Sequence, residues 1–320
     1  MSLVLAIAAA AGAAETPPIC ADRPAKASAV CTVPAGKMQI ESGLADWTLT
    51  KAGGTRTGVL ALGSTTAKLG LTSASDLQVT VTPYTRIRVR DGGSASGFGD
   101  TIVRYKQRLS RDDAPVQVGL IPFVKIPTAA HALGNGKIEG GLSVPVSFAL
   151  AGPITMTLGP EADLLADADG RGRHVAIVNV VNLSAPVAPR VTLGGELWSS
   201  INFDPAGTTR QASADLALAY AVSNDLQLDA GANFGLTRNT PDVETYGGLS
   251  VRFLAAPPNE GSRRLGVGLQ QRAGGNIHRE SQATGLEAKA RLAIEIVRKA
   301  ARQQFEAEAI ALRFRRNAVP

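Results

Sequence analysis

The chain has 320 residues, a formal net charge of +6, 19% charged residues and 34 glycines. Its 44% hydrophobic content is ordinary for a globular protein, so composition leaves one large domain or two smaller ones open. No apolar run reaches the roughly 18 to 20 residues that a transmembrane helix needs, which excludes a membrane role through helices.

The N-terminus predicts an exported protein. Leu3 to Ala14 is a short, alanine-rich apolar run that ends in small residues before a cut at Ala14 or Glu15, as in a secretory signal. We therefore assign residues 1–14 to a signal peptide. Only Met1 and Ser2 precede the run, so the usual charged leading region is missing and the true translation start stays open. A buried N-terminal helix is the alternative.

The two cysteines, Cys20 and Cys31, lie in a polar stretch, residues 15–36, that we expect to form a periplasmic N-terminal segment. An even cysteine count in an exported chain predicts a disulfide bond. Closing so short a loop should stabilise the segment by about 2 to 3 kcal/mol. A two-cysteine metal site is disfavoured, because no histidine or further cysteine lies nearby, and no metal is expected.

From Lys37 to Phe253 the apolar residues recur at every second position, the period of a strand with one apolar face. Residues 225–237 show the pattern best, since Leu226 and Leu228 alternate with Gln227 and Asp229. The pattern predicts an all-β fold, a closed antiparallel transmembrane β-barrel of about twelve strands over residues 37–253. The expected strands are 37–50, 57–71, 76–90, 99–109, 114–126, 137–151, 153–166, 173–184, 189–202, 209–222, 225–237 and 243–253.

The predicted connections alternate between short and long, as in outer-membrane barrels with turns on one rim and loops on the other. Short links are expected at 72–75, 110–113, 152, 185–188 and 223–224, and longer ones at 52–56, 91–98, 127–136, 167–172, 203–208 and 238–242. A soluble β-sandwich also alternates apolar with polar residues, but it does not require an even strand count or charge ladders on one face.

Two features disagree with a barrel. Aromatic residues make up only 4% of the chain, which is few for aromatic girdles at both membrane interfaces. Four prolines fall inside predicted strands, where each should mark a bulge or a strand end. They are Pro83, Pro122, Pro145 and Pro160.

The polar face of the predicted strands carries the candidate functional residues. Seven bases form a ladder expected to line the lumen: Arg86, Arg88, Arg90, Arg104, Lys106, Arg108 and Lys125. Seven acids are expected on the strands that close the ring: Glu139, Glu161, Asp163, Glu196, Asp215, Asp229 and Glu244. Charges in a narrow lumen require either water or a network of ion pairs. A wet lumen would favour small polar solutes, whereas an interlocked one would be plugged or gated.

Several short motifs resemble one family of outer-membrane proteins. They are Gly97-Phe98-Gly99-Asp100, Pro122-Phe123-Val124-Lys125-Ile126-Pro127-Thr128, Gly134-Asn135-Gly136, Glu139-Gly140-Gly141 and the closing stretch 246–253. Together they resemble the outer-membrane transporter family named for the meta-cleavage pathway of phenol degradation. The resemblance implies a barrel associated with transport, in the outer membrane of a Gram-negative bacterium. It leaves the substrate open, with hydrophobic or aromatic catabolic compounds suggested by the family name.

The last predicted strand resembles the terminal signal that barrel insertion machinery reads, with Tyr246 and a final aromatic residue, Phe253. A basic tail, residues 254–320, follows it with twelve Lys and Arg against six Asp and Glu, and thus holds the whole net charge of +6. Gly285 to Phe314 could form an amphipathic helix, and a periplasmic arm that touches anionic partners is one function for the tail. Disorder, or a frame-shifted readthrough past the natural stop, is the favoured alternative.

No motif predicts catalysis, a cofactor or a nucleic-acid partner. The three histidines, His131, His174 and His278, have no spacing typical of a metal site or a Ser/His/acid triad. The expected partners are outer-membrane lipid, the insertion machinery and a small-molecule solute, with the oligomeric state open. We predict a passive outer-membrane channel and no enzyme. The alternatives are a non-conducting structural or surface barrel and, third, a barrel with lipase activity.

Overall fold

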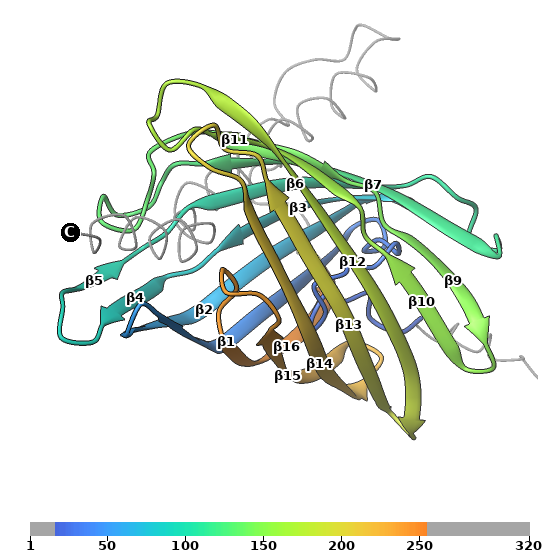
Figure 1. Ribbon diagram of the computed structural model, residues 1–320. Helices are drawn as coiled ribbons and strands as arrows, with labels where there is room; N and C mark the ends of the chain where they lie inside the picture. The colour runs from blue at the N-terminus through green and yellow to red at the C-terminus, as the bar shows by residue number, and fades with distance from the viewer. Residues whose placement is uncertain (1–16, 255–320) are drawn as a thin grey trace, which may run out of the picture.

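The computed structural model describes residues 17–254, which form one antiparallel sheet of sixteen hydrogen-bonded segments. The first segment pairs with both the second and the last, so the sheet closes on itself (Figure 1). The segments are β1 (Lys37–Ala52), β2 (Thr55–Thr72), β3 (Ser75–Val81), β4 (Tyr84–Val89), β5 (Ser94–Gly97), β6 (Thr101–Arg108), β7 (Val116–Ile126), β8 (Glu139–Ser143), β9 (Val146–Ala151), β10 (Ile154–Leu158), β11 (Glu161–Ala166), β12 (Arg173–Ala188), β13 (Val191–Asn202), β14 (Thr209–Ser223), β15 (Leu226–Gly235) and β16 (Val243–Leu254).

The sixteen segments are twelve strands, because four strands are each interrupted once. The interrupted strands are β3/β4, β5/β6, β8/β9 and β10/β11. In each of them, the two parts are hydrogen-bonded to the same neighbouring strands, except that β5 is bonded to β4 alone. The prediction of a closed antiparallel barrel of twelve strands is confirmed. The predicted signal peptide (1–14) and the tail beyond Leu254 lie outside the described residues.

Proline explains three of the four interruptions. Pro83, Pro145 and Pro160 each lie between the two parts of a broken strand, where the missing N–H removes a ladder hydrogen bond. Pro122 instead lies inside the continuous strand β7, so the expected strand end is not there. The ladder between β6 and β7 is nevertheless interrupted beside it, between the pairs Arg104–Phe123 and Gln107–Leu120, as expected next to a residue without an N–H.

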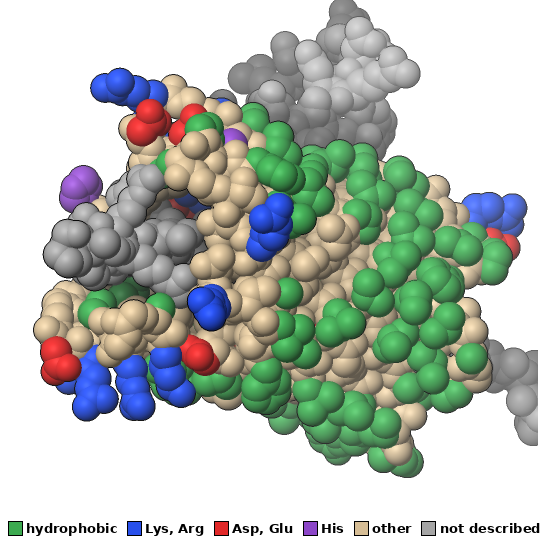
Figure 2. All heavy atoms as spheres, viewed as in Figure 1, with side chains coloured by type: hydrophobic (Ala, Val, Ile, Leu, Met, Phe, Trp, Pro, Cys, Tyr) green, Lys and Arg blue, Asp and Glu red, His purple; other side chains and the backbone are tan. Residues whose placement is uncertain are grey.

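Polar and apolar residues are distributed as in a membrane barrel. Among the described residues, 27 polar or charged residues are buried against 14 hydrophobic ones, while leucines such as Leu71, Leu183 and Leu197 are exposed. Figure 2 shows hydrophobic side chains covering most of the wall toward the end where the β9–β10 and β12–β13 turns lie in Figure 1. An apolar exterior around a polar interior is the pattern of a transmembrane β-barrel. Residues 17–254 contain no helix that is long and apolar enough to cross a membrane.

The two rims differ largely as predicted, with four exceptions. The link between β1 and β2, expected to be long, is a two-residue turn of Gly53 and Gly54, whose φ angles of 56° and 78° suit a tight hairpin. The β12–β13 turn is at Pro189 and Arg190 rather than at 185–188, because β12 continues to Ala188. The link expected at 91–98 has only four residues, 90–93, because β5 follows it, and the link expected at 110–113 has seven, 109–115. The other long links lie on the rim that Gly53 shares, and the other short turns form the opposite rim.

Candidate functional site: the barrel interior

Residues 17–36 lie inside the ring of strands. Side chains from eight of the twelve strands contact this segment, and only a position within the barrel can reach so many of them. These side chains come from β1, β2, β3, β6, β13, β14, β15 and β16. The segment is the dark blue chain inside the barrel in Figure 1. Its apolar side chains Cys20, Ala27, Val30 and Val33 are buried there. We call residues 17–36 the inner segment.

Asp22 attaches the inner segment to the basic wall. Its Oδ1 accepts a hydrogen bond from Lys106 Nζ at 2.7 Å, and its Oδ2 accepts one from Lys68 Nζ at 2.5 Å. Lys68 also forms an ion pair with Glu41, whose carboxylate accepts the backbone N–H groups of Asp22 and Arg23. Burial opposes ionisation of Asp22, but Lys106 and Lys68 outweigh it and hold the pKa of this carboxyl below its usual range.

The acidic wall holds the inner segment from the other side. Arg23 pairs with Asp229 at 2.8 Å, and Lys26 pairs with Asp215 at 3.1 Å. Glu196 accepts the backbone N–H groups of Lys26 and Ala27, at 2.8 and 2.9 Å. The segment therefore places an acid against the basic wall and bases against the acidic wall, so it neutralises charges on both walls.

The predicted disulfide between Cys20 and Cys31 is present, with its sulfur atoms 2.07 Å apart. Contacts with the wall flank it on both sides. Gln39 donates a hydrogen bond to the Cys20 carbonyl at 2.6 Å, and Val33 N–H donates to Asp76 at 2.9 Å. The bridge thus closes the part of the inner segment that carries Asp22, Arg23 and Lys26 into a compact loop.

A second charge cluster lies nearer the rim with long links. Lys125 Nζ contacts Asp100 at 3.1 Å, Glu139 at 2.8 Å and the side-chain oxygen of Asn135 at 2.8 Å. The 127–138 link folds over this cluster, since Ala129 N–H donates to Asp100 and Leu133 is buried against Val59 and Ile87. This cluster joins the 127–138 link to the interior wall.

Other predicted residues also lie on the inward face. Arg104 donates to Thr80 at 2.7 Å and stacks 5.9 Å from the centre of the Phe123 ring. Arg108 bonds the carbonyls of Ser73 and Ser110 at the short-turn rim. Three of the acids are on the same face: Asp163 is buried on β11 with Glu161 two residues away, and Glu244 on β16 accepts from Asn233 at 2.7 Å.

The prediction that Arg86, Arg88 and Arg90 line the lumen is wrong. These three arginines lie on the outer face of the barrel. Within β4 it is Ile87 that points inward, at 1% exposure, where it packs with Val59 and Leu133. Arg86 and Arg88 share the outward face with Tyr84, and Arg90 follows the strand as an exposed residue. The basic ladder inside the barrel therefore consists of Arg104, Lys106, Arg108 and Lys125, joined by Lys68.

The alternation of inward and outward side chains changes phase along a line of three residues, which crosses β1, β2 and the break between β3 and β4. Leu44 and Gly63 lie opposite each other, and Pro83 continues the same line. Gly63 has a φ of 68°, a left-handed conformation that glycine adopts without strain. Ser64 and Thr82 face inward on one side of this line, whereas Val59 and Ile87 face inward on the other. A strict period of two across Pro83 therefore assigned the arginines to the wrong face.

The residues that hold the inner segment were not predicted from the sequence. Asp22, Arg23 and Lys26 alternate in sign within one short stretch, a pattern that a charged lumen can match, but nothing in it indicated insertion into the barrel. Glu41 and Lys68 were also missed, although both lie on polar positions of predicted strands. Both residues occupy positions whose place in the two-residue period points inward, and this criterion identified the other acids and bases.

Comparison with known proteins assigns the chain to a family. Residues 21–253 match the family model described as "Putative MetA-pathway of phenol degradation", and the chain belongs to this family. No curated protein matches the sequence significantly.

Among solved structures, an outer-membrane channel from Pseudomonas putida F1 is similar in fold, with a TM-score of 0.54 and 16% identity over 70% of this chain and 98% of the other. The NanC porin matches with a TM-score of 0.46 and 10% identity, over 67% of this chain and 98% of its own. The fold is that of the outer-membrane β-barrels of Gram-negative bacteria.

Proposed function

We propose that the protein is a passive outer-membrane channel for small molecules, with the inner segment as its gate. The observation that carries the proposal is the mode of attachment of this segment. It is held by side-chain ion pairs and hydrogen bonds such as Lys106–Asp22 and Arg23–Asp229, with polar groups on both sides. Such contacts can exchange with water, whereas a continuous apolar core across the lumen could not open without exposing apolar surface.

The competing function is a non-conducting barrel, in which the same ion pairs serve as a permanent plug. The polar wall favours the channel, because a barrel with a purely structural role can fill its interior with apolar side chains. Here, charged residues with partners on the inner segment, such as Asp229, Asp215 and Lys106, occupy the interior instead. Removing the segment would leave a wet, charged passage.

An enzymatic role is not part of the proposal. His174 and Asp167 form a hydrogen-bonded pair at 2.8 Å, and such a pair makes up two of the three members of a catalytic triad. However, Nε2 of His174 is buried and has no hydrogen-bond partner among the described residues, so no nucleophile is joined to it. Within residues 17–254 no group of three metal-binding side chains occurs either.

The family description supports a substrate class, small aromatic or hydrophobic compounds of catabolic origin, as a finer part of the proposal. Leu133, Val59 and Ile87 form a small apolar cluster beneath the 127–138 link, only 1 to 7% exposed, so an aromatic ring would contact it only after this link moves aside. The charged region nearer the short-turn rim would then act on the polar group of the solute.

The closing strand supports recognition by the insertion machinery. Phe253 is 43% exposed on the outer face of β16 and lies at its end. Tyr246 is on the inward face, where Arg23 lies 5.8 Å from the centre of its ring. We therefore place the outward signal on Phe253 alone and assign Tyr246 to the interior.

Swelling of proteoliposomes tests the proposed function. The full chain, reconstituted into liposomes, should cause swelling in isosmotic 4-hydroxybenzoate and glycine and little in a trisaccharide, because a twelve-strand barrel has a narrow lumen. Asp22→Asn should raise the rate for the small solutes. Insertion without swelling in any solute, in both forms, would favour the non-conducting barrel.

A further inference from the structure

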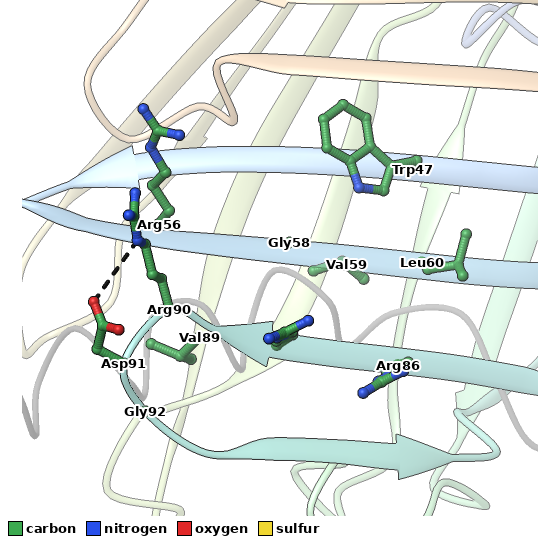
Figure 3. Close-up of a pocket in the computed structure, with 11 residues that line it drawn as sticks. Trp47, Arg56, Gly58, Val59, Leu60, Arg86, Val89, Arg90, Asp91 and Gly92 are labelled. Carbon is green, nitrogen blue, oxygen red and sulfur yellow. Dashed lines mark ion pairs between the residues drawn. The ribbon is translucent and has the colours of Figure 1, made fainter.

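Four arginines form an exposed basic groove on the outer wall, beside the rim with long links. Arg86, Arg88 and Arg90 come from β4 and the residue after it, and Arg56 comes from β2 (Figure 3). With Trp47 and Leu60 they line an open groove of about 730 Å³. We call these four residues the arginine groove. It does not face the lumen, so it has no part in the proposed passage.

Strand pairing brings these side chains together. Trp47, Leu60 and Arg86 are register partners across β1, β2 and β4, and Gly58 pairs with Arg88 in the next outward row. Arg90 N–H donates to the Arg56 carbonyl at 2.8 Å, which fixes the last row. Gly58 has no side chain, so nothing from β2 stands between Arg56 and Leu60 on this face.

The groove lies at the edge of the apolar wall. On β2 the outward side chains from Leu60 to Leu71 are uncharged. Twelve strand residues rise about 3.3 Å each, and with a strand tilt of about 40° they span roughly 30 Å, which is the thickness of a hydrocarbon layer. The arginines therefore begin where this layer ends. The long-link rim of bacterial barrels faces the cell exterior, so the adjacent lipid belongs to the outer leaflet.

Few carboxylates neutralise the charges of these arginines. Within residues 17–254, Arg90 pairs with Asp91 at 3.7 Å, and no carboxylate forms an ion pair with Arg56, Arg86 or Arg88. Guanidinium groups match phosphate oxygens in two-point hydrogen bonds, and several in one groove attract a multiply charged headgroup. Trp47, 41% exposed, lies on the membrane side, as aromatic residues do at interfaces.

We propose that the arginine groove binds the phosphate groups of a phosphorylated glycolipid of the outer leaflet. The phosphates would contact Arg56, Arg86, Arg88 and Arg90, and the acyl chains would lie along Leu60 and the apolar wall below it. The groove thereby fixes the depth of the barrel in the membrane next to the β4–β5 link.

Native mass spectrometry of the purified full chain in detergent tests this site. The probes are bisphosphorylated lipid A, the same lipid without phosphates, and inorganic phosphate. The wild type should retain bisphosphorylated lipid A and lose most of that binding with the dephosphorylated lipid. The double variant R86Q/R88Q should bind bisphosphorylated lipid A about tenfold more weakly, because each basic residue near the surface contributes about a fivefold factor at most.

The matched control removes two exposed arginines from other links on the same rim, R171Q/R238Q, and should bind as the wild type does. The variant R56Q/R90Q should reproduce the loss if R86Q/R88Q folds poorly, and heat-modifiable gel mobility reports folding of both. Equal binding by all variants would overturn the proposal. Equal binding of both lipids would show that acyl chains alone are recognised, and a stronger response to inorganic phosphate than to lipid A would replace the lipid by a free anion.

Discussion

Lys106 on the wall and Asp22 on the inner segment are joined by a hydrogen-bonded ion pair of 2.7 Å between Nζ and Oδ1. The two residues are 84 positions apart in the sequence. Lys106 also donates to the Ala29 carbonyl at 2.8 Å, so one lysine binds the inner segment at two points. This lysine therefore couples the position of the segment to the basic wall.

Acidification should leave this attachment intact over a wide range. Because the pKa of Asp22 is lowered, its contribution is fully present above the ordinary value of 3.8 and is lost only as the pH falls through the lowered value. We therefore expect the Asp22 contacts to favour the closed state equally at pH 7 and pH 5, so conductance recordings should show the same difference in open probability between the wild type and Asp22→Asn at both pH values. If the wild type opened more at pH 5 than at pH 7 and Asp22→Asn showed no such change, the Asp22 contacts would be lost at pH 5. That result would contradict the lowered pKa of Asp22.

The disulfide should keep the inner segment in place. Without it, the double substitution C20S/C31S frees a loop whose closure contributes about 3 kcal/mol in the loop-entropy model, while the barrel strands keep their contacts. We expect unchanged heat-modifiable mobility but faster cleavage of the segment by a protease added to detergent-solubilised protein. Peptide mapping without reductant should find the two cysteines linked in the wild type. Equal protease resistance of both forms would show that the ion pairs suffice.

Ion selectivity should separate the inward arginine from the outward one. Arg104→Gln removes a positive charge from the inner wall, and Arg86→Gln removes the same charge from the outer wall. In a salt gradient, Arg104→Gln should shift the reversal potential toward cation selectivity by several millivolts, because local attraction for anions falls. Arg86→Gln should leave the potential unchanged. Equal shifts would mean that the two side chains see the same aqueous path.

The inversion at Gly63 should be sensitive to a side chain. Gly63→Ala places a Cβ on a residue with φ of 68°, which costs about 1 to 2 kcal/mol. The control Gly58→Ala adds a Cβ that meets nothing closer than 3.9 Å. Thermal unfolding followed by gel mobility should show a lower midpoint for Gly63→Ala alone. An equal effect at both sites would remove the left-handed turn as the cause.

Periodicity was sufficient to predict the twelve strands, since each strand has one apolar face and inward acids such as Asp215 and Asp229 keep their parity along uninterrupted strands. It was insufficient across Pro83, because a left-handed glycine on the neighbouring strand changes which face points inward. That glycine's φ depends on the pairing of three strands, which a single sequence does not display.

The inner segment was unpredictable for a related reason. The ion pairs of Asp22, Arg23 and Lys26 join them to residues that lie as many as 206 positions away. Local sequence indicated a disulfide and a polar stretch, and both are present. Insertion into the barrel depends on complementary charges that become neighbours only after the ring closes.

Single-channel conductance of the full chain in a planar bilayer tests the central claim most directly. The wild type should show brief, infrequent openings, and Asp22→Asn should open more often or for longer, because loss of the contacts to Lys68 and Lys106 weakens the hold on the inner segment by about 1 to 3 kcal/mol. Asp113→Asn, which changes an exposed acid at the short-turn rim, should behave as the wild type. Correctly inserted protein that stays silent in all three forms would contradict a gated channel.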